Sequence, residues 1–354
     1  MKVGMFQTPF LRPERSAAQV FDWAIRQAVV ADEAGFTEYW VGEHATLDWE
    51  SIPSPELVIA ACARVTKNIM LGPLAHLIPY YHPATLAIQS AWLSQLTEGR
   101  YMLGVATGAY PTDAALRGIT DMKINHSMML EGIEIMEKVW KAEPFEHKGE
   151  FWNAGYPVED PGHPFRDTRP YGGKMQMAMT GLSAPSPSIK FAATRGYLPA
   201  SVYAGNAFLR SHFDDYAEVA QANGHPVGRH LHRVVRDVVI ADTDAEAMAL
   251  AKKGLGLAWE TYLKPTYERF GVLKGLLHDP DFDTAKVDAD YLAEHVWIVG
   301  SPETVVEKFE KWFDDLGGPF GTVLIYSHDY IDDPKPWEES MHRLAQEVAP
   351  KLKD

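Results

Sequence analysis

One pattern recurs along this chain and limits its fold more than any other feature: a short apolar run that ends in a polar or glycine- and proline-rich loop. Residues 39–44 form the clearest case, because that run ends in the carboxylate of Glu43 and the imidazole of His44. Residues 68–76 and 101–108 repeat the pattern, and each follows a segment with helical periodicity. Repeated strand, loop and helix units predict a parallel sheet with its functional residues at the carboxyl ends of the strands.

Helix signals occupy the stretches between these runs. Ser16 and Gln19 have the form of a capping box, and the helix that they open is expected to stop at Gly35. A second helix is expected to begin with Ser54 as its N-cap and Pro55 at its first position. Further helical segments are expected at residues 82–96, 125–141, 189–193, 208–222, 245–259, 302–316 and 338–352.

The number of expected strands indicates the architecture. They lie at residues 2–7, at 38–42, from 69 onward, and at 101–106, 175–179, 199–203, 234–241 and 321–326. Eight strands with helices between them are typical of a (β/α)8 TIM barrel, here a single α/β domain over residues 1–354 with loop insertions. Residues 144–173 carry no convincing period, and they suit either an interdomain linker or a long functional loop over the barrel mouth.

An open, doubly wound sheet is the alternative architecture, and one missing motif counts against it. No expected strand is followed by the GxGxxG pattern of dinucleotide-binding folds. We therefore do not expect the chain to carry its own nicotinamide-binding domain.

Charge and cysteine content exclude several classes of function. The formal net charge is −15 with acidic residues spread along the chain, whereas nucleic acids and anionic membranes require a basic surface. Cys62 is the single cysteine, so no intramolecular disulfide can form. The amino terminus has the pattern of a strand and not of a signal peptide, and no stretch approaches the roughly 18 apolar residues of a membrane helix. We expect a cytoplasmic protein that binds neither nucleic acid nor membrane.

Barrel geometry ranks residues at strand ends above all others as functional candidates. The rule selects Phe6, Glu43, His44, Ala75, His76, Thr107, Thr180, Tyr203 and residues 327–329. Among these, His44 lies just beyond a strand and follows Glu43, whose carboxylate could fix the imidazole tautomer. The alternative is a structural histidine bonded to its neighbours; the position favours a functional one.

Three serines, Ser183, Ser186 and Ser188, precede the helical segment at residues 189–193. Hydroxyl groups at a helix amino terminus suit a phosphate group. Each serine taken alone also fits an ordinary N-cap, so both interpretations stay open.

Neither a metal centre nor a serine hydrolase is expected. His230 and His232 would share one face of a strand, but arginines surround them and no third ligand is nearby. Residues 327–329, with the sequence Ser-His-Asp, are adjacent, so alternation along a strand points them apart, and the chain has no GxSxG motif.

Aromatic residues are frequent at expected loop positions: Phe6, Tyr80, Tyr81, Tyr110, Tyr171, Tyr203, Tyr326 and Trp337. Several fit the core or the rim of a barrel equally well. Gathered at the mouth, they would form an apolar pocket for a planar cofactor and a hydrophobic substrate. Tyr110, Tyr203 and Trp337 are the candidates for contact with the substrate.

Several of these motifs together resemble the bacterial luciferase-like flavin monooxygenases over essentially the whole chain. The resemblance rests on Glu43 and His44, on residues 72–83, which end in His-Pro, and on the Gly-Arg-aromatic pattern within residues 98–104. The chain also resembles the diketocamphane monooxygenase branch of this family, at residues 52–57, 108–111, 180–183 and 328–337. Members of that branch oxygenate cyclic terpenoid ketones.

The resemblance implies a site as well as a fold. His44 and Glu43 are the expected catalytic residues; the resemblance places His44 beside the isoalloxazine ring and makes the Leu74–Ala75 bond a non-prolyl cis peptide under that ring. Together with the strand-end rule, the resemblance gives these candidates for cofactor binding: Phe6, Leu74, Ala75, Thr107, Thr180, Ser183, Ser186 and Ser188. Light-emitting members have a reactive cysteine and a phosphate-binding arginine where this chain has Ala106 and Thr107, so neither light emission nor an unchanged phosphate site is expected.

The implied activity is that of a two-component monooxygenase. The barrel, usually a dimer in this family, would take FMNH2 from a separate flavin reductase, which agrees with the missing nicotinamide motif. The reduced flavin would react with O2 to give a C4a-peroxide, which would oxygenate a hydrophobic carbonyl substrate in a Baeyer–Villiger reaction. Two alternatives stay open at this point. One is a deazaflavin (F420)-dependent oxidoreductase on the same barrel, and the other is a flavin-binding protein without catalytic activity.

Overall fold

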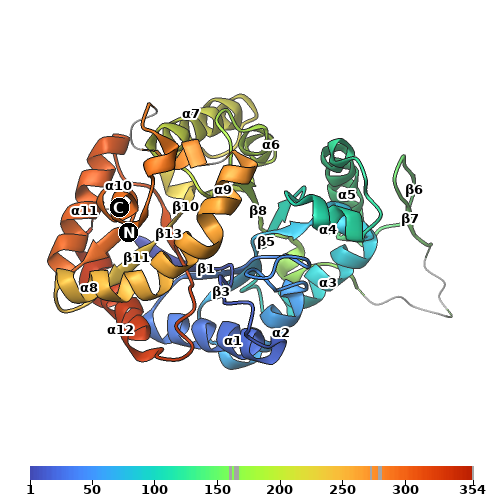
Figure 1. Cartoon of the computed structure of the whole chain (residues 1–354). Coiled ribbons are helices and arrows are strands. Elements are labelled where there is room, and N and C mark those ends of the chain that lie inside the picture. Colours follow the sequence, from blue (N-terminus) through green and yellow to red (C-terminus); the bar gives the residue numbers. More distant parts are fainter. Residues whose placement is uncertain (159–161, 163–166, 272, 278–280, 353–354) are drawn as a thin grey trace.

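Nine parallel strand segments form one curved sheet at the centre of the molecule (Figure 1). The computed structural model describes residues 1–158, 162, 167–271, 273–277 and 281–352. Along the sheet the strands follow the order β3, β2, β1, β13, β10, β9, β8, β5, β4. Their bounds are β1 (Lys2–Gln7), β2 (Glu38–Val41), β3 (Met70–Pro73), β4 (His76–Leu77), β5 (Leu103–Ala106), β8 (Met177–Gly181), β9 (Leu198–Ser201), β10 (Arg233–Arg236) and β13 (Thr322–Tyr326).

The sheet closes on itself because β3 and β4 are two halves of one barrel strand. They are separated only by Leu74 and Ala75. On one side β3 pairs with β2, and on the other β4 pairs with β5. A further parallel bridge between Leu71 and Tyr101 joins β3 to the residues before β5. The nine segments therefore make eight barrel strands, which confirms the predicted (β/α)8 architecture.

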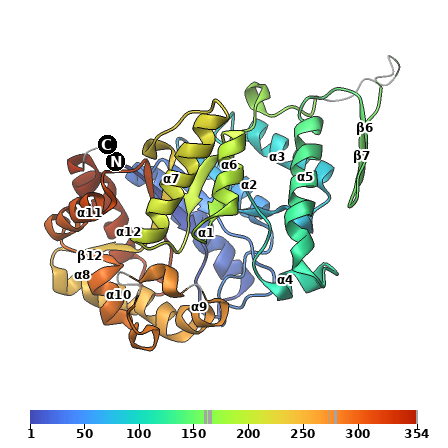
Figure 2. The ribbon, with the colours of Figure 1, turned by 90° about the horizontal axis from the view of Figure 1, so that it is seen from above.

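Helices follow the barrel strands and surround the sheet (Figures 1 and 2). They are α1 (Ala17–Ala34), α2 (Pro55–Val65), α3 (Pro83–Leu96), α4 (Pro111–Leu116), α5 (Asn125–Val139), α6 (Pro187–Arg195), α7 (Asn206–Ala222), α8 (Asp244–Ala251), α9 (Lys264–Phe270), α10 (Ala289–His295), α11 (Pro302–Leu316) and α12 (Lys335–Arg343). In the described part of the chain no helix is both long enough and apolar enough to cross a membrane.

The helix boundaries confirm most of the capping signals. Ser16 and Gln19 form the capping box of α1, and Gly35 ends that helix with a φ of 97°, a left-handed conformation that suits glycine. Ser54 is the N-cap residue of α2 and Pro55 its first residue, but the Ser54 side chain makes no capping hydrogen bond.

The predicted strand at residues 234–241 is wrong as a single element. Strand β10 ends at Arg236, and β11 (Val238–Ile240) pairs with β12 (Ile298–Gly300) in a separate two-stranded sheet. Asp237 lies at the break between the two strands, where its carbonyl oxygen accepts a hydrogen bond from the Ile298 amide. Buried valines lie on both sides of the break, so the pattern suggests one strand although Arg236 and Asp237 interrupt it.

Residues 144–173 contain a feature that the sequence pattern did not predict. Strands β6 (Phe145–Lys148) and β7 (Asn153–Tyr156) form an antiparallel hairpin that projects beside α5 (Figures 1 and 2). The Glu131 carboxylate on α5 accepts hydrogen bonds from three backbone amides at residues 150–152, which ties the hairpin to the helix. Residues 159–161 and 163–166 of this interval lie outside the described part.

The expected helix at residues 245–259 is interrupted. Helix α8 passes into π-helical turns at Lys252–Gly256 and Trp259–Leu263 before α9 begins. Turns of this kind are frequent at functional sites, because they redirect the side chains of a helix. Trp259 and Tyr262, both buried, belong to the second of these turns.

Candidate active site

A cavity of about 350 Å³ opens at the carboxyl ends of the barrel strands; we call it the main cavity. It brings together many residues that the sequence selected: Phe6, Glu43, His44, Leu74, Ala75, Thr107, Tyr110, Thr180, Ser188 and Tyr203. The sequence did not select Thr8, Glu50, Thr266 and Tyr267, which also line it. Barrel geometry explains the agreement, because strand-end residues from many parts of the chain converge there.

The imidazole of His44 lies between two buried carboxylates. Its Nδ1 atom is 3.1 Å from Oδ2 of Asp113, and its Nε2 atom is 3.5 Å from Oε2 of Glu50. The ring of Tyr110 packs against it edge-on, with the ring centres 4.8 Å apart. Burial opposes protonation, but Glu50, Asp113 and Glu43 together outweigh it and raise the pKa of His44 above its ordinary value. The site therefore favours a charged imidazolium.

Asp113 holds the loop after β2 as well as the imidazole. Its Oδ1 atom accepts hydrogen bonds from the amides of Ala45 and Thr46, at 3.1 and 2.9 Å, and from the Thr46 hydroxyl at 2.7 Å. Burial alone would raise the pKa of Asp113, but the hydrogen bonds from His44 and Thr46 lower it to about 2. Sequence reasoning missed this residue. The sequence held one indication of its role: Asp113 is an acidic residue in the first turn of α4, two positions after the motif at residues 108–111.

Glu50 links the same loop to the opposite side of the barrel mouth. Its Oε1 atom accepts a hydrogen bond of 2.7 Å from the hydroxyl of Tyr262, which belongs to the second π-helical turn. The neighbouring ring of Trp49 stacks on Tyr262 with the ring centres 5.8 Å apart. Burial raises the pKa of Glu50 above its ordinary value. We call Asp113 and Glu50 the carboxylate frame of His44; nothing local in the sequence pointed to Glu50.

Glu43 does not fix the tautomer of His44, so that prediction is wrong. Its Oε2 atom lies 2.9 Å from Nδ1 of His76, and it accepts a weaker hydrogen bond from the Leu77 amide at 3.4 Å. Consecutive side chains that leave a strand point in different directions, which separates Glu43 from the neighbouring imidazole. His76 itself is buried and does not line the main cavity.

The Leu74–Ala75 peptide bond is cis, as the family resemblance implied. Both residues line the main cavity. Gly104 on β5 permits the close approach of the chains here, because a Cβ atom at that position would lie 2.2 Å from the carbonyl oxygen of Pro73.

The three candidate serines have different environments. The Ser186 hydroxyl is the N-cap of α6 and accepts a hydrogen bond from the Ile189 amide at 3.3 Å, whereas the Ser183 hydroxyl donates to the Pro185 carbonyl at 3.1 Å. Neither lines the main cavity, whereas Ser188 and Thr180 do. The amino terminus of α6 therefore meets the cavity through Ser188.

Trp337 lies away from the main cavity, which contradicts its expected contact with a substrate. It is fully buried in α12, stacks on Tyr330 with ring centres 5.1 Å apart, and donates a hydrogen bond of 2.6 Å to Gln27 on α1. It packs α12 against α1, as an aromatic residue on the inner face of an amphipathic helix does.

Residues 327–329 do not combine into one catalytic group. His328 is paired with Asp237 at 2.8 Å, and Asp329 forms a salt bridge with Arg15. Among the described residues there is no cluster of three or more His, Cys, Asp and Glu side chains that could hold a metal ion.

Comparison with known proteins adds a family to this geometry. Residues 1–318 match the family described as luciferase-like monooxygenase. The chain is 49% identical to 2,5-diketocamphane 1,2-monooxygenase 1 of Pseudomonas putida, over 100% of this chain and 99% of that protein.

Solved structures show the same relationship. The oxygenating constituent of 3,6-diketocamphane monooxygenase from Pseudomonas putida, a type II Baeyer–Villiger monooxygenase in complex with FMN, is 45% identical and superimposes with a TM-score of 0.95 over 100% of this chain and 99% of that one. The coenzyme F420-dependent tetrahydromethanopterin reductase of Methanopyrus kandleri is 18% identical with a TM-score of 0.71, over 99% of each chain. That degree of likeness extends to the fold alone.

Proposed function

The chain belongs to the luciferase-like monooxygenase family and is an FMN-dependent monooxygenase of the Baeyer–Villiger type, and from this premise we propose that its substrates are hydrophobic cyclic ketones of the terpenoid kind. The observation that carries the proposal is identity of 45–49% along the full chain to proteins named for diketocamphanes. The F420-dependent alternative rests only on a distant likeness of fold. The alternative of an inactive flavin-binding protein is set aside, because the related proteins are monooxygenases.

The main cavity fits a reduced flavin. Its wall is largely apolar, and the Thr8 hydroxyl, which lines it, is buried without a hydrogen-bond partner among the described residues. A ligand with polar edges would satisfy that hydroxyl. Leu74 and Ala75 would support the flat ring system. Thr180 near the end of β8 and Ser188 in the first turn of α6 would hold the phosphate. When bound, reduced FMN supplies the reaction with O2.

For His44 we propose the role of a fixed positive charge in the cavity wall. The carboxylate frame faces both ring nitrogens and favours the imidazolium, which has no lone pair to accept a proton. The cation would stabilise negative charge that develops on oxygen during the reaction. His44→Ala is expected to abolish or uncouple oxygenation while FMN binding stays measurable, and an unchanged yield of product would overturn the role.

The activity is tested directly with a labelled oxidant. The purified protein, an NADH-dependent flavin reductase and FMN are incubated with a diketocamphane under ¹⁸O₂, and the products are analysed by mass spectrometry. We expect a lactone that contains one ¹⁸O atom. Consumption of O2 with H2O2 as the only product, for every cyclic ketone tried, would contradict the proposal.

A second copy of the chain and a reductase are the proposed partners. The outer faces of α2 and α3 expose Leu57 and Val65, eight residues apart, and Ile88 and Trp92, four residues apart. These spacings place each pair on one helix face, and the two helices pack side by side. Apolar faces of this kind mark protein interfaces. We propose that they meet in a homodimer, and that the dimer receives FMNH2 from a separate reductase in the cytoplasm.

The dimer is tested by sedimentation at several concentrations. Ile88→Glu should yield monomers, whereas Leu116→Glu, an exposed apolar position on α4, should leave the mass unchanged. A wild-type protein that sediments as a monomer at all concentrations would contradict the interface.

A further inference from the structure

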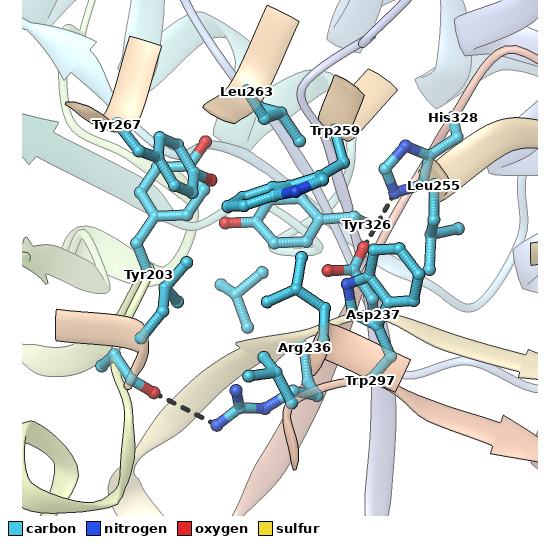
Figure 3. Close-up of a pocket in the computed structure, with 15 residues that line it drawn as sticks. Tyr203, Arg236, Asp237, Leu255, Trp259, Leu263, Tyr267, Trp297, Tyr326 and His328 are labelled. Atoms are coloured by element: carbon cyan, nitrogen blue, oxygen red, sulfur yellow. Dashed lines mark hydrogen bonds and ion pairs between the residues drawn. The ribbon is translucent and has the colours of Figure 1, made fainter. Parts of the chain in front are cut away.

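A second, smaller cavity lies behind one wall of the main cavity (Figure 3). Its volume is about 30 Å³, and we call it the chamber. Tyr203 and Tyr267 line both spaces, so these two side chains form the partition between them. The remaining polar residues of the chamber are Arg236, Asp237, Trp259, Tyr326 and His328. None of these five residues lines the main cavity, and the roles proposed above use none of them.

The chamber contains an ionisable pair of which only the histidine is buried. Nε2 of His328 lies 2.8 Å from Oδ1 of Asp237, and Figure 3 shows this contact at one side of the chamber. The His328 side chain is 1% exposed, but that of Asp237 is 17% exposed. Asp237 occupies the break between β10 and β11, where the backbone turns away from the barrel. The pair therefore connects the chamber with the solvent.

A buried cation adjoins this pair. Arg236 is 6% exposed, donates a hydrogen bond of 3.1 Å to the Ala204 carbonyl, and lies 4.3 Å from the ring centre of Trp312. Burial lowers the pKa of Arg236 to about 10, while Asp237 and Tyr326 act in the opposite direction. A positive charge in this position favours oxygen atoms with lone pairs in the chamber.

One donor aimed at this region has no acceptor. The Nε1 atom of Trp259 is buried and has no hydrogen-bond partner among the residues that the structure describes. An indole N–H can only donate, and buried donors are nearly always paired with protein or with ordered water. The chamber volume exceeds the ~10–15 Å³ that a water molecule requires. Polar walls and sufficient space together indicate water.

Phenol groups continue from the chamber to the main cavity. The rings of Tyr326 and Tyr203 stack with centres 5.6 Å apart, and the ring of Tyr203 packs edge-on against that of Tyr267 with centres 4.7 Å apart. The Tyr326 hydroxyl is buried and has no hydrogen-bond partner among the described residues. Burial raises the pKa of all three phenols well above the ordinary value, so they remain protonated. A protonated phenol can pass a proton on by giving one and receiving another in the same event.

We propose that the chamber holds ordered water between Trp259, Asp237 and the unpartnered Tyr326 hydroxyl, and that this water carries protons between the Asp237–His328 pair and Tyr203 at the main cavity. Tyr203 gives its hydroxyl proton to an oxygen atom in the cavity and takes one from the chamber water. Tyr326 holds that water through its hydroxyl, and the Asp237–His328 pair replaces the proton of the water from solvent. Each O–H bond that breaks is matched by one that forms, and the path runs in reverse when a proton leaves.

The water site is tested without any turnover. A crystal structure of the flavin-free protein should show ordered water within about 3.2 Å of Trp259 Nε1. Trp259→Phe removes the N–H and keeps an aromatic ring, and the water should be lost or displaced in that variant. A dry chamber in the wild-type protein would overturn the proposal.

The relay is tested by kinetics, and this part rests on the monooxygenase activity proposed above. In Tyr326→Phe and Asp237→Asn, kcat should fall by about tenfold, less than the roughly 10²–10⁴-fold that a direct acid or base contributes, with a larger solvent deuterium isotope effect and an unchanged KM for the ketone. Tyr216→Phe is the matched control, because it removes a buried phenol that donates to the Tyr197 carbonyl outside both cavities. Wild-type rates and isotope effects in both relay variants would overturn the relay.

Failure of the relay and failure of the proposed function are distinguishable. If the wild-type protein oxygenates no ketone, the proposed function is wrong, and the relay fails with it, while the crystallographic test of the chamber still applies. If the wild-type protein forms lactone and the relay variants behave like it, only the relay is wrong.

Discussion

Nδ1 of His44 lies 3.1 Å from Oδ2 of Asp113, although the two residues follow different strands of the barrel and stand 69 positions apart in the chain. Glu50 faces the other ring nitrogen. The geometry bears on the chemistry of the site, because an imidazole with a carboxylate at each nitrogen is held as a cation and not as a base. The following predictions start from this contact.

Asp113→Asn should lower the pKa of His44, because the substitution removes one of the two negative charges beside the ring. In the wild-type protein the imidazolium is present below its raised pKa and is lost as the pH rises through that value. NMR titration of the flavin-free proteins measures the pKa of His44 in the wild type and in the variant. Asp242→Asn, which removes an exposed partner of Arg343, serves as the control. A pKa of His44 that is the same in all three proteins would contradict the frame.

Acid should destabilise the protein partly through Asp113. Its pKa is lowered to about 2, so the stabilisation is complete above the unfolded value of about 4 and is lost as the pH falls through about 2. Urea unfolding between these pH values should show a steeper loss of free energy for the wild type than for Asp113→Asn. Parallel curves for the two proteins would rule out this contribution.

Tyr262→Phe should destabilise the fold by about 1–3 kcal/mol, because Glu50 loses its hydroxyl donor while it remains buried. Tyr197→Phe is the control: its hydroxyl donates to Glu137, which is partly exposed, so water can replace the lost contact. We expect less than about 1 kcal/mol there. Equal losses in the free energy of unfolding would show that the buried Glu50–Tyr262 hydrogen bond contributes no more than the exposed one.

Ser188→Ala should weaken the binding of FMN by about two- to tenfold, the range expected for one hydrogen bond. Ser183→Ala should change it little, because the Ser183 hydroxyl donates to the Pro185 carbonyl and does not line the main cavity. Fluorescence titration with FMN compares the two variants. A larger loss in Ser183→Ala would place the phosphate elsewhere in the loop.

The sequence predicted features that depend on neighbours along the chain. The capping box at Ser16, the start of α3 at Pro83 and the bounds of α11 follow from local signals, and the structure confirms them. The barrel itself follows from counting strands. Strand ends then led to many of the residues around the main cavity, because barrel topology brings those ends together.

The missed features depend on contacts that no local pattern records. Glu43 and His44 are adjacent, yet they bind different partners because their side chains diverge. Glu50 lies in an irregular loop, and its donor Tyr262 comes from a helix whose π-helical turns have no period to detect. Trp337 carried a plausible motif, but its burial against α1 is decided by packing alone.

The surroundings of His44 have a consequence for any attempt to redesign this barrel. Glu50 follows β2, Asp113 belongs to the helix after β5, and Tyr262 comes from the region between α8 and α9. TIM barrels are often treated as scaffolds whose loops can be exchanged one at a time. Here a transplanted loop would bring new substrate contacts, but the residues that had contacted the replaced loop would lose their hydrogen-bond partners. Useful chimeras of this enzyme would therefore have to inherit the three segments as one unit.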